Sequence, residues 1–182
     1  MYNFHYKTWL EHFPQTRLLF TDTDSLAYEV EHDNLNEVMA TFADALDFSE
    51  YPVNHSLYDT VNRKVVGKFK DELHGDSMTK FIGLRPKLYS YEYRDCHGVR
   101  KSKNTAKGVK KSVKDNKLTF EDYEHCLREM CVEPVSMNCI RSDHHQLFTY
   151  NINKIGLSAF DDKRFICDDG VTTLAHGHWR TR

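Results

Sequence analysis

The sequence lacks long apolar runs and paired cysteines. No apolar stretch approaches the ~20 residues that cross a membrane, and the amino-terminal MYNFHYKTWLEHF lacks the basic start and apolar centre of a signal peptide. Its five cysteines are odd in number and form no CxxC pair, which argues against a disulfide framework or a zinc ribbon. Repeats and low-complexity segments are also absent. We therefore expect a protein with reduced thiols, an intracellular location and no membrane partner.

The composition favours a folded protein with segregated charge. With 182 residues, 40% of them hydrophobic and 13% aromatic, the chain suits one domain or a domain with an appendage. Residues 1–62 carry eleven acids and two bases, whereas residues 100–117 carry eight Lys or Arg and one acid. The basic run can be a solvated surface, but its Gly, Ser, Thr and Asn would also suit contact with a phosphate backbone. Both interpretations remain open.

Two aspartates, Asp22 and Asp24, stand between two strand-like segments. Residues 18–20 are an apolar run, and apolar residues alternate over 26–30, which predicts a hairpin with the aspartates at its tip. Two carboxylates on one face of an extended chain repel each other unless a cation lies between them. This pattern favours a magnesium site for phosphoryl or nucleotidyl transfer. For a bare DxD, an Asp-rich turn is the alternative.

The remaining pattern predicts a mixture of helices and antiparallel strands. Helices are expected over residues 2–13, with an aromatic face that includes Tyr2 and Tyr6, after a cap at residue 33 or 34, and after a cap at Thr119. The apolar face of the second helix would extend to Leu46, and that of the third through Leu127 and Met130. Several antiparallel strands are predicted between residues 64 and 103, and shorter ones beyond residue 133.

One predicted strand, KLYSYEY, carries a stripe of tyrosines. Alternation places Lys87, Tyr89, Tyr91 and Tyr93 on one face. A tyrosine stripe is usually half-buried packing. Because Lys87 is predicted on the same face, a ligand-binding surface is the alternative.

These motifs, in this order, resemble those of family B DNA polymerases. TDTDS (21–25) resembles their motif C, and LRPKLYSYEY (84–93) resembles the Lys-x-Tyr signature that follows it in the palm. The segments VVGKFKDEL, AKGVKKSV and LTFEDYEHCL, and the carboxyl-terminal stretch from MNCIRSDHHQ onward, are similar to the protein-primed branch. That branch is found in viruses, linear organellar plasmids and Polinton/Maverick-type transposons. The resemblance covers nearly the whole chain.

The resemblance implies an α+β fold. An antiparallel palm sheet with packing helices would carry the motif C hairpin, and a small thumb-like α/β appendage would follow. Residues 1–117 would be the carboxyl-terminal half of the palm, and residues 118–182 the thumb and tail. The implied activity is template-directed nucleotidyl transfer with two Mg²⁺ ions. The implied partners are primer–template DNA, dNTP, a terminal priming protein and the rest of the polymerase chain.

The resemblance also implies roles for individual residues. Asp24 would be the main catalytic metal ligand and Asp22 its weaker partner, while Lys87 and Tyr89 would steady the primer end. Lys107, Lys110 and Lys111 fall where palm meets thumb, and we infer that they grip duplex phosphates. Motif A, which supplies another metal-binding Asp, does not occur in these residues, nor do motif B and the exonuclease. We therefore expect part of a larger polymerase that does not extend a primer alone.

Two other functions compete with the polymerase, and the histidines raise the separate question of a zinc site. A transposon relic would bind DNA without catalysis. A haloacid-dehalogenase-like phosphatase also places a DxD after an apolar strand, but it would have a parallel sheet, whereas the strands here predict an antiparallel one. Four histidines with Cys167 lack the tight paired spacing of zinc sites, and we predict surface or core positions for His144, His145, His176 and His178.

Overall fold

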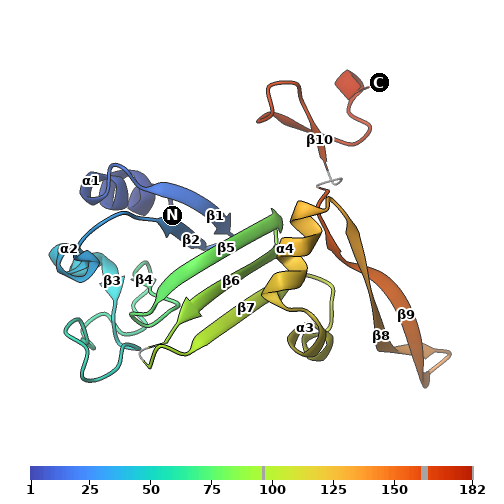
Figure 1. Ribbon diagram of the computed structural model, residues 1–182, viewed down its shortest axis with the longest axis horizontal. Helices are drawn as coiled ribbons and strands as arrows, with labels where there is room; N and C mark the ends of the chain where they lie inside the picture. The colour runs from blue at the N-terminus through green and yellow to red at the C-terminus, as the bar shows by residue number, and fades with distance from the viewer. Residues whose placement is uncertain (96, 161–163, 182) are drawn as a thin grey trace. The chain divides into compact units, whose positions relative to one another are not determined.

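A computed structural model describes residues 1–95, 97–160 and 164–181 (Figure 1). In these ranges the chain has a mixed α+β fold with four α-helices and several small, mostly antiparallel sheets, so the predicted fold class is confirmed. None of the helices described is long and apolar enough to span a membrane. The chain divides into two compact units, Met1–Met78 with Tyr93–Val99, and Thr79–Glu92 with Arg100–Arg182. The division into palm and thumb after residue 117 stays a prediction.

The first unit contains two strand pairs and short helices. Its elements are a π-helical segment (Phe4–Trp9), α1 (Leu10–His12), β1 (Arg17–Asp22), β2 (Ser25–Glu29), α2 (Leu35–Thr41), a 3₁₀ turn (Ala43–Ala45), β3 (Leu46–Asp47) and β4 (Phe69–Lys70). Strands β1 and β2 are antiparallel, whereas β3 and β4 are parallel. Within the described ranges β1 and β2 pair only with each other. Side-chain packing anchors the hairpin within this unit, and the palm sheet expected to carry it stays a prediction.

An aromatic cluster forms the core of the first unit. Phe4, Trp9 and Phe13 are buried, but Tyr2 and Tyr6, which were predicted on the same face, are 82% and 61% exposed. Phe4 and Trp9 are five residues apart, which is the hydrogen-bond spacing of a π-helix, and Trp9 and Phe13 are four apart, as in an α-helix. The widened first turn therefore shifts the buried stripe away from the predicted one.

Two further expectations in the first unit were wrong in detail. Helix α2 begins after Asn34, as predicted, but it ends at Thr41, so Leu46 starts β3 instead of extending the helical face. Residues 64–68 form turns instead of a strand. The buried Asp47 carboxylate accepts the backbone N–H of Lys64 at 3.1 Å, so this donor is not available to a sheet.

The second unit holds most of a three-stranded sheet and a long hairpin. Its elements are β5 (Ser77–Arg85), β6 (Leu88–Arg94), β7 (Arg100–Ala106), α3 (Lys111–Lys117), α4 (Phe120–Arg128), β8 (Val132–Asp143), β9 (Gln146–Ser158), β10 (Arg164–Ile166), β11 (Thr173–Ala175) and a 3₁₀ turn (Trp179–Thr181). The sheet order is β5-β6-β7, and the two-residue connection from β5 to β6 requires those strands to be antiparallel. Strands β8 and β9 form an antiparallel hairpin, as do β10 and β11.

Helix α4 packs across the sheet β5-β6-β7 (Figure 1). The Thr119 side chain accepts the backbone N–H of Asp122 at 3.3 Å, and the Asp122 carboxylate accepts that of Thr119 at 2.7 Å, so the predicted cap is confirmed. Tyr123 is fully buried, but Leu127 and Met130 are 41% and 53% exposed. Met130 lies beyond the helix end with a φ of 48°, which removes it from the predicted apolar face.

Candidate metal and nucleic-acid site

The DTD motif forms the end of the β1–β2 hairpin. Asp22 and Ser25 are the last paired residues, so Thr23 and Asp24 form a two-residue loop. The Ser25 hydroxyl donates to the Asp22 carbonyl at 3.0 Å, and the Thr23 hydroxyl donates to the Asp22 carboxylate at 3.3 Å. The predicted hairpin is confirmed. The Asp22 side chain is half-buried and that of Asp24 is exposed.

The loop itself has an uncommon backbone conformation. Thr23 has a φ of 60°, and the N–H of Asp24 donates to the carbonyl of Asp22 at 2.7 Å, which closes a three-residue turn. A positive φ is rare for a β-branched residue and costs about 1–3 kcal/mol. The chain is thus not extended here, and the expectation that strand alternation puts both carboxylates on one face is wrong. Asp24 is instead presented by a strained turn.

The base of the hairpin is fixed by aromatic packing. The ring of Tyr28 on β2 stacks on Trp9 with centroids 4.5 Å apart, and its hydroxyl lies 2.9 Å from Nδ1 of His5. Burial raises the pKa of Tyr28 to about 12. Leu26 and Val30 pack against the same core. These contacts give the strained turn a rigid support.

Of the Lys-x-Tyr pair, Tyr89 lies on the predicted strand, whereas Lys87 lies outside it. Lys87 follows Pro86 in the turn between β5 and β6 and has a φ of 60°, so it is not part of the strand alternation. Tyr89 is in β6 and half-buried, with its ring 6.1 Å from that of Phe81. Tyr91 is only 6% exposed, which supports the packing interpretation of the tyrosine stripe at that position.

Hydrogen bonds bring segments that carry lysines close together in the second unit. The N–H of Lys107 donates to the carbonyl of Lys87 at 3.1 Å, which brings the turn before β6 next to the end of β7. Lys110 is the residue before α3 and Lys111 is its first residue. The Lys154 ammonium on β9 donates to the carbonyl of Gly108 at 3.1 Å. Sequence reasoning missed Lys154, because it is 46 residues away from Gly108.

The three predicted phosphate-binding lysines are available to an external anion. Lys107, Lys110 and Lys111 are exposed, and none of the ion pairs found among the described residues involves them. The first turn of α3 contains no acidic residue. Lysines at the positive end of a helix are locally unfavourable. A bound anion would offset this repulsion.

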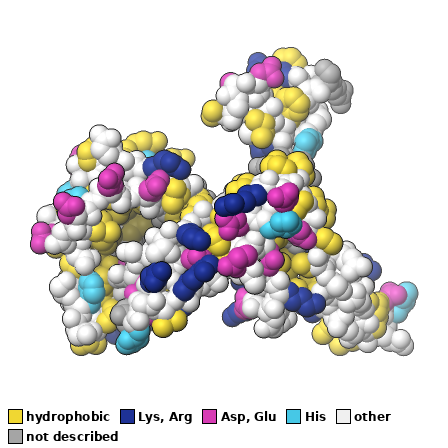
Figure 2. All heavy atoms as spheres, viewed as in Figure 1, with side chains coloured by type: hydrophobic (Ala, Val, Ile, Leu, Met, Phe, Trp, Pro, Cys, Tyr) yellow, Lys and Arg dark blue, Asp and Glu magenta, His cyan; other side chains and the backbone are white. Residues whose placement is uncertain are grey.

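Arg100, at the start of the basic run 100–117, forms ion pairs within the protein. The buried Glu92 carboxylate accepts Nε of Arg100 at 2.6 Å, and Arg100 also pairs with Glu121 at 2.9 Å. The hydrogen bond to Glu92 raises the pKa of Arg100. These residues line a groove of about 500 Å³, and Figure 2 shows acidic and basic side chains side by side over this region. The basic run therefore has both a structural part and an unpaired part.

Asp22 and Asp24 belong to no larger cluster of metal-ligating residues in the described ranges. The one group of three that is close enough to hold an ion there is His125, Cys131 and Glu133. Magnesium is often held by one or two carboxylates together with waters and substrate phosphates. The hairpin can therefore supply part of a magnesium site. His144 and His145 form the exposed β8–β9 turn, with φ values of 46° and 64°.

Comparisons of this chain with protein-family models, curated proteins and solved structures found no match. The family resemblance therefore depends on the motifs themselves.

Proposed function

We propose that this chain is the palm and thumb part of a protein-primed family B DNA polymerase. Its reaction would be template-directed nucleotidyl transfer. The observation that carries this proposal is the TDTDS hairpin, in which the exposed Asp24 lies in a strained two-residue loop directly after Asp22. Strained backbone tends to occur at functional sites.

The two aspartates would hold magnesium ions. Carboxylate oxygens suit this hard cation, and exposure makes Asp24 the more direct ligand, with the half-buried Asp22 as its partner. Two-metal catalysis holds the ions ~3.5–4 Å apart and needs further carboxylates. In the family, another aspartate comes from motif A, which is not among these residues. We therefore expect no primer extension by the 182-residue chain alone.

The second unit would contact primer–template DNA. Lys107, Lys110 and Lys111 are exposed and can approach phosphate oxygens, while Lys87 and Tyr89 match the motif that steadies the primer end. Such contacts position DNA without reading its sequence. The nucleotide and a priming protein would be the other partners, as in the family.

A DNA-binding relic is the second candidate, since the exposed lysines support binding whether or not catalysis occurs. A DxD phosphatase receives less support, because β1 pairs antiparallel with β2 instead of lying in a parallel sheet. Phosphate release from a phosphomonoester, lost in Asp22→Asn, would favour the phosphatase.

Two measurements on the purified chain test the proposal. Its affinity for primer–template DNA should fall steeply with salt, because Lys–phosphate contacts release counterions. Primer extension with magnesium and dNTP should be absent. Salt-independent binding would contradict the proposed DNA contacts, and robust extension would contradict the requirement for a motif A aspartate.

A further inference from the structure

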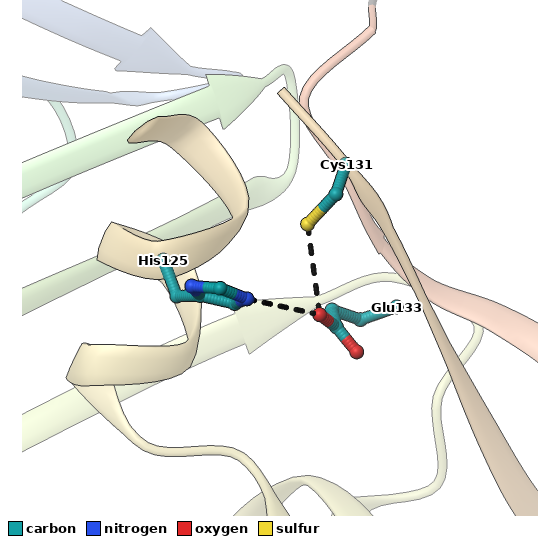
Figure 3. A group of neighbouring side chains, drawn as sticks. All are labelled: His125, Cys131 and Glu133. Carbon is teal, nitrogen blue, oxygen red and sulfur yellow. Dashed lines mark hydrogen bonds and ion pairs between the residues drawn. The ribbon is translucent and has the colours of Figure 1, made fainter. Parts of the chain in front are cut away.

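We infer that His125, Cys131 and Glu133 form a zinc-binding site at the junction of α4 and β8. Each side chain offers one ligand atom, and the three atoms all lie within 4.8 Å of one another. Figure 3 shows the imidazole and the thiol pointing toward the same carboxylate oxygen. The site has no role in the proposed nucleotidyl transfer and does not depend on it.

The end of helix α4 brings the thiol back beside the imidazole. Met130 adopts a left-handed φ of 48°, and the N–H of Cys131 donates to the carbonyl of Cys126 at 3.2 Å. This bond between residues five apart is typical of a Schellman turn, which reverses the chain after a helix. Cys131 therefore lies close to the last helical turn, which carries His125.

The backbone of Cys131 is held by further hydrogen bonds. Its carbonyl accepts the N–H of Ala159 at 3.1 Å and the thiol of Cys126 at 3.2 Å. Glu133 follows two residues later, in β8, beside an irregularity in the pairing with β9. Such irregularities often redirect a side chain. The thiol and the carboxylate are thus presented by a well-supported backbone.

The separations suit a small tetrahedral ion. Nε2 of His125 lies 3.7 Å from Oε1 of Glu133, and Sγ of Cys131 lies 3.6 Å from the same oxygen. Bonds from zinc of ~2.0–2.2 Å to nitrogen or oxygen and ~2.3 Å to sulfur give ligand separations of about 3.4–3.6 Å at tetrahedral angles. The third separation, between His125 and Cys131, is within 4.8 Å and would have to be no longer than about 3.6 Å when the ion binds.

The ligand types favour zinc over the hard cations. Thiolate and imidazole suit Zn²⁺, whereas Mg²⁺ and Ca²⁺ prefer oxygen ligands throughout. The His125 side chain is 61% exposed and that of Glu133 is 39% exposed, so water can take the fourth position. Bound zinc would join the last turn of α4 to the start of β8. The bound ion would thereby stabilise the start of the β8–β9 hairpin.

Cobalt, a coloured substitute for zinc, tests the site directly. The chelator-treated chain, kept reduced by a phosphine, should bind one Co²⁺ with tetrahedral ligand-field bands and a thiolate-to-cobalt absorption, and zinc should displace it. Cys131→Ser should abolish the thiolate absorption and weaken zinc binding by more than about 100-fold, the upper effect of outer-shell changes. Cys139→Ser, which changes a thiol outside the cluster, should leave both unchanged.

A second variant separates metal binding from simple hydrogen bonding. Glu133→Gln retains an acceptor oxygen for the thiol but removes the anionic ligand, so it should weaken zinc binding while circular dichroism shows an intact fold. The inference is overturned if Cys131→Ser keeps the thiolate absorption, if Glu133→Gln binds zinc as well as wild type, or if the wild-type chain binds no cobalt. None of these outcomes bears on primer extension.

Discussion

Neutralising the three exposed lysines at the end of β7 and the start of α3 should weaken DNA binding by a calculable amount. Each phosphate contact with duplex DNA contributes ~0.9 to the slope of log affinity against log salt, so replacing Lys107, Lys110 and Lys111 with Gln should reduce the slope by about 2.7. Over a fourfold increase in salt, from about 50 to 200 mM, this difference corresponds to about 40-fold in affinity. Fluorescence anisotropy with a labelled primer–template at several salt concentrations measures both slopes.

A second triple variant controls for net charge. Replacing Lys7, Arg63 and Lys64 with Gln also removes three exposed positive charges, so both variants change the net charge from −2 to −5. The control variant should keep the wild-type slope. Equal slopes for all three proteins would refute the assignment of phosphate contacts to Lys107, Lys110 and Lys111. Equal reductions in both variants would show that overall charge, instead of these lysines, governs binding.

Three further predictions concern stability, each measured by urea unfolding. Burial acts to raise the pKa of Asp47, but backbone N–H hydrogen bonds outweigh it and lower the pKa below its ordinary 3.8. The ionised Asp47 carboxylate therefore contributes its full stabilisation above its pKa in the unfolded chain. This stabilisation is lost as the pH falls through its lower pKa in the folded protein. Asp47→Asn should cost about 1–3 kcal/mol near pH 7, with the difference shrinking below about pH 4, whereas the exposed Asp44→Asn should show neither effect. Gly156→Ala should cost about 1–3 kcal/mol, because its Cβ would lie 2.6 Å from Val135 Cγ1, and Val135→Ala in the same chain should recover part of the loss. Thr119→Ala should cost about 1 kcal/mol and Thr119→Ser much less, since only the serine retains the cap; equal losses would contradict the capping role.

Features with local sequence signals were predictable. Thr119 and Asn34 cap helices because their side chains bond to backbone N–H groups three residues ahead, and this needs no distant partner. The hairpin around Asp22 followed from apolar runs on either side of a polar turn.

Features that depend on unusual backbone or distant contacts were not predictable. Thr23 and Met130 have positive φ values where no glycine signals them, so neither the strained turn nor the chain reversal after α4 was foreseen. The reversal is what brings His125 and Cys131 together, six positions apart. Lys154 reaches Gly108 only through the tertiary fold.

The most direct test of the central claim is primer extension by the protein expressed from its complete native reading frame. With a primed template, magnesium and dNTP, we predict template-directed incorporation that Asp24→Asn abolishes and that the 182-residue chain alone does not perform. Incorporation that survives Asp24→Asn would contradict the assignment of the DTD hairpin as part of the catalytic metal site.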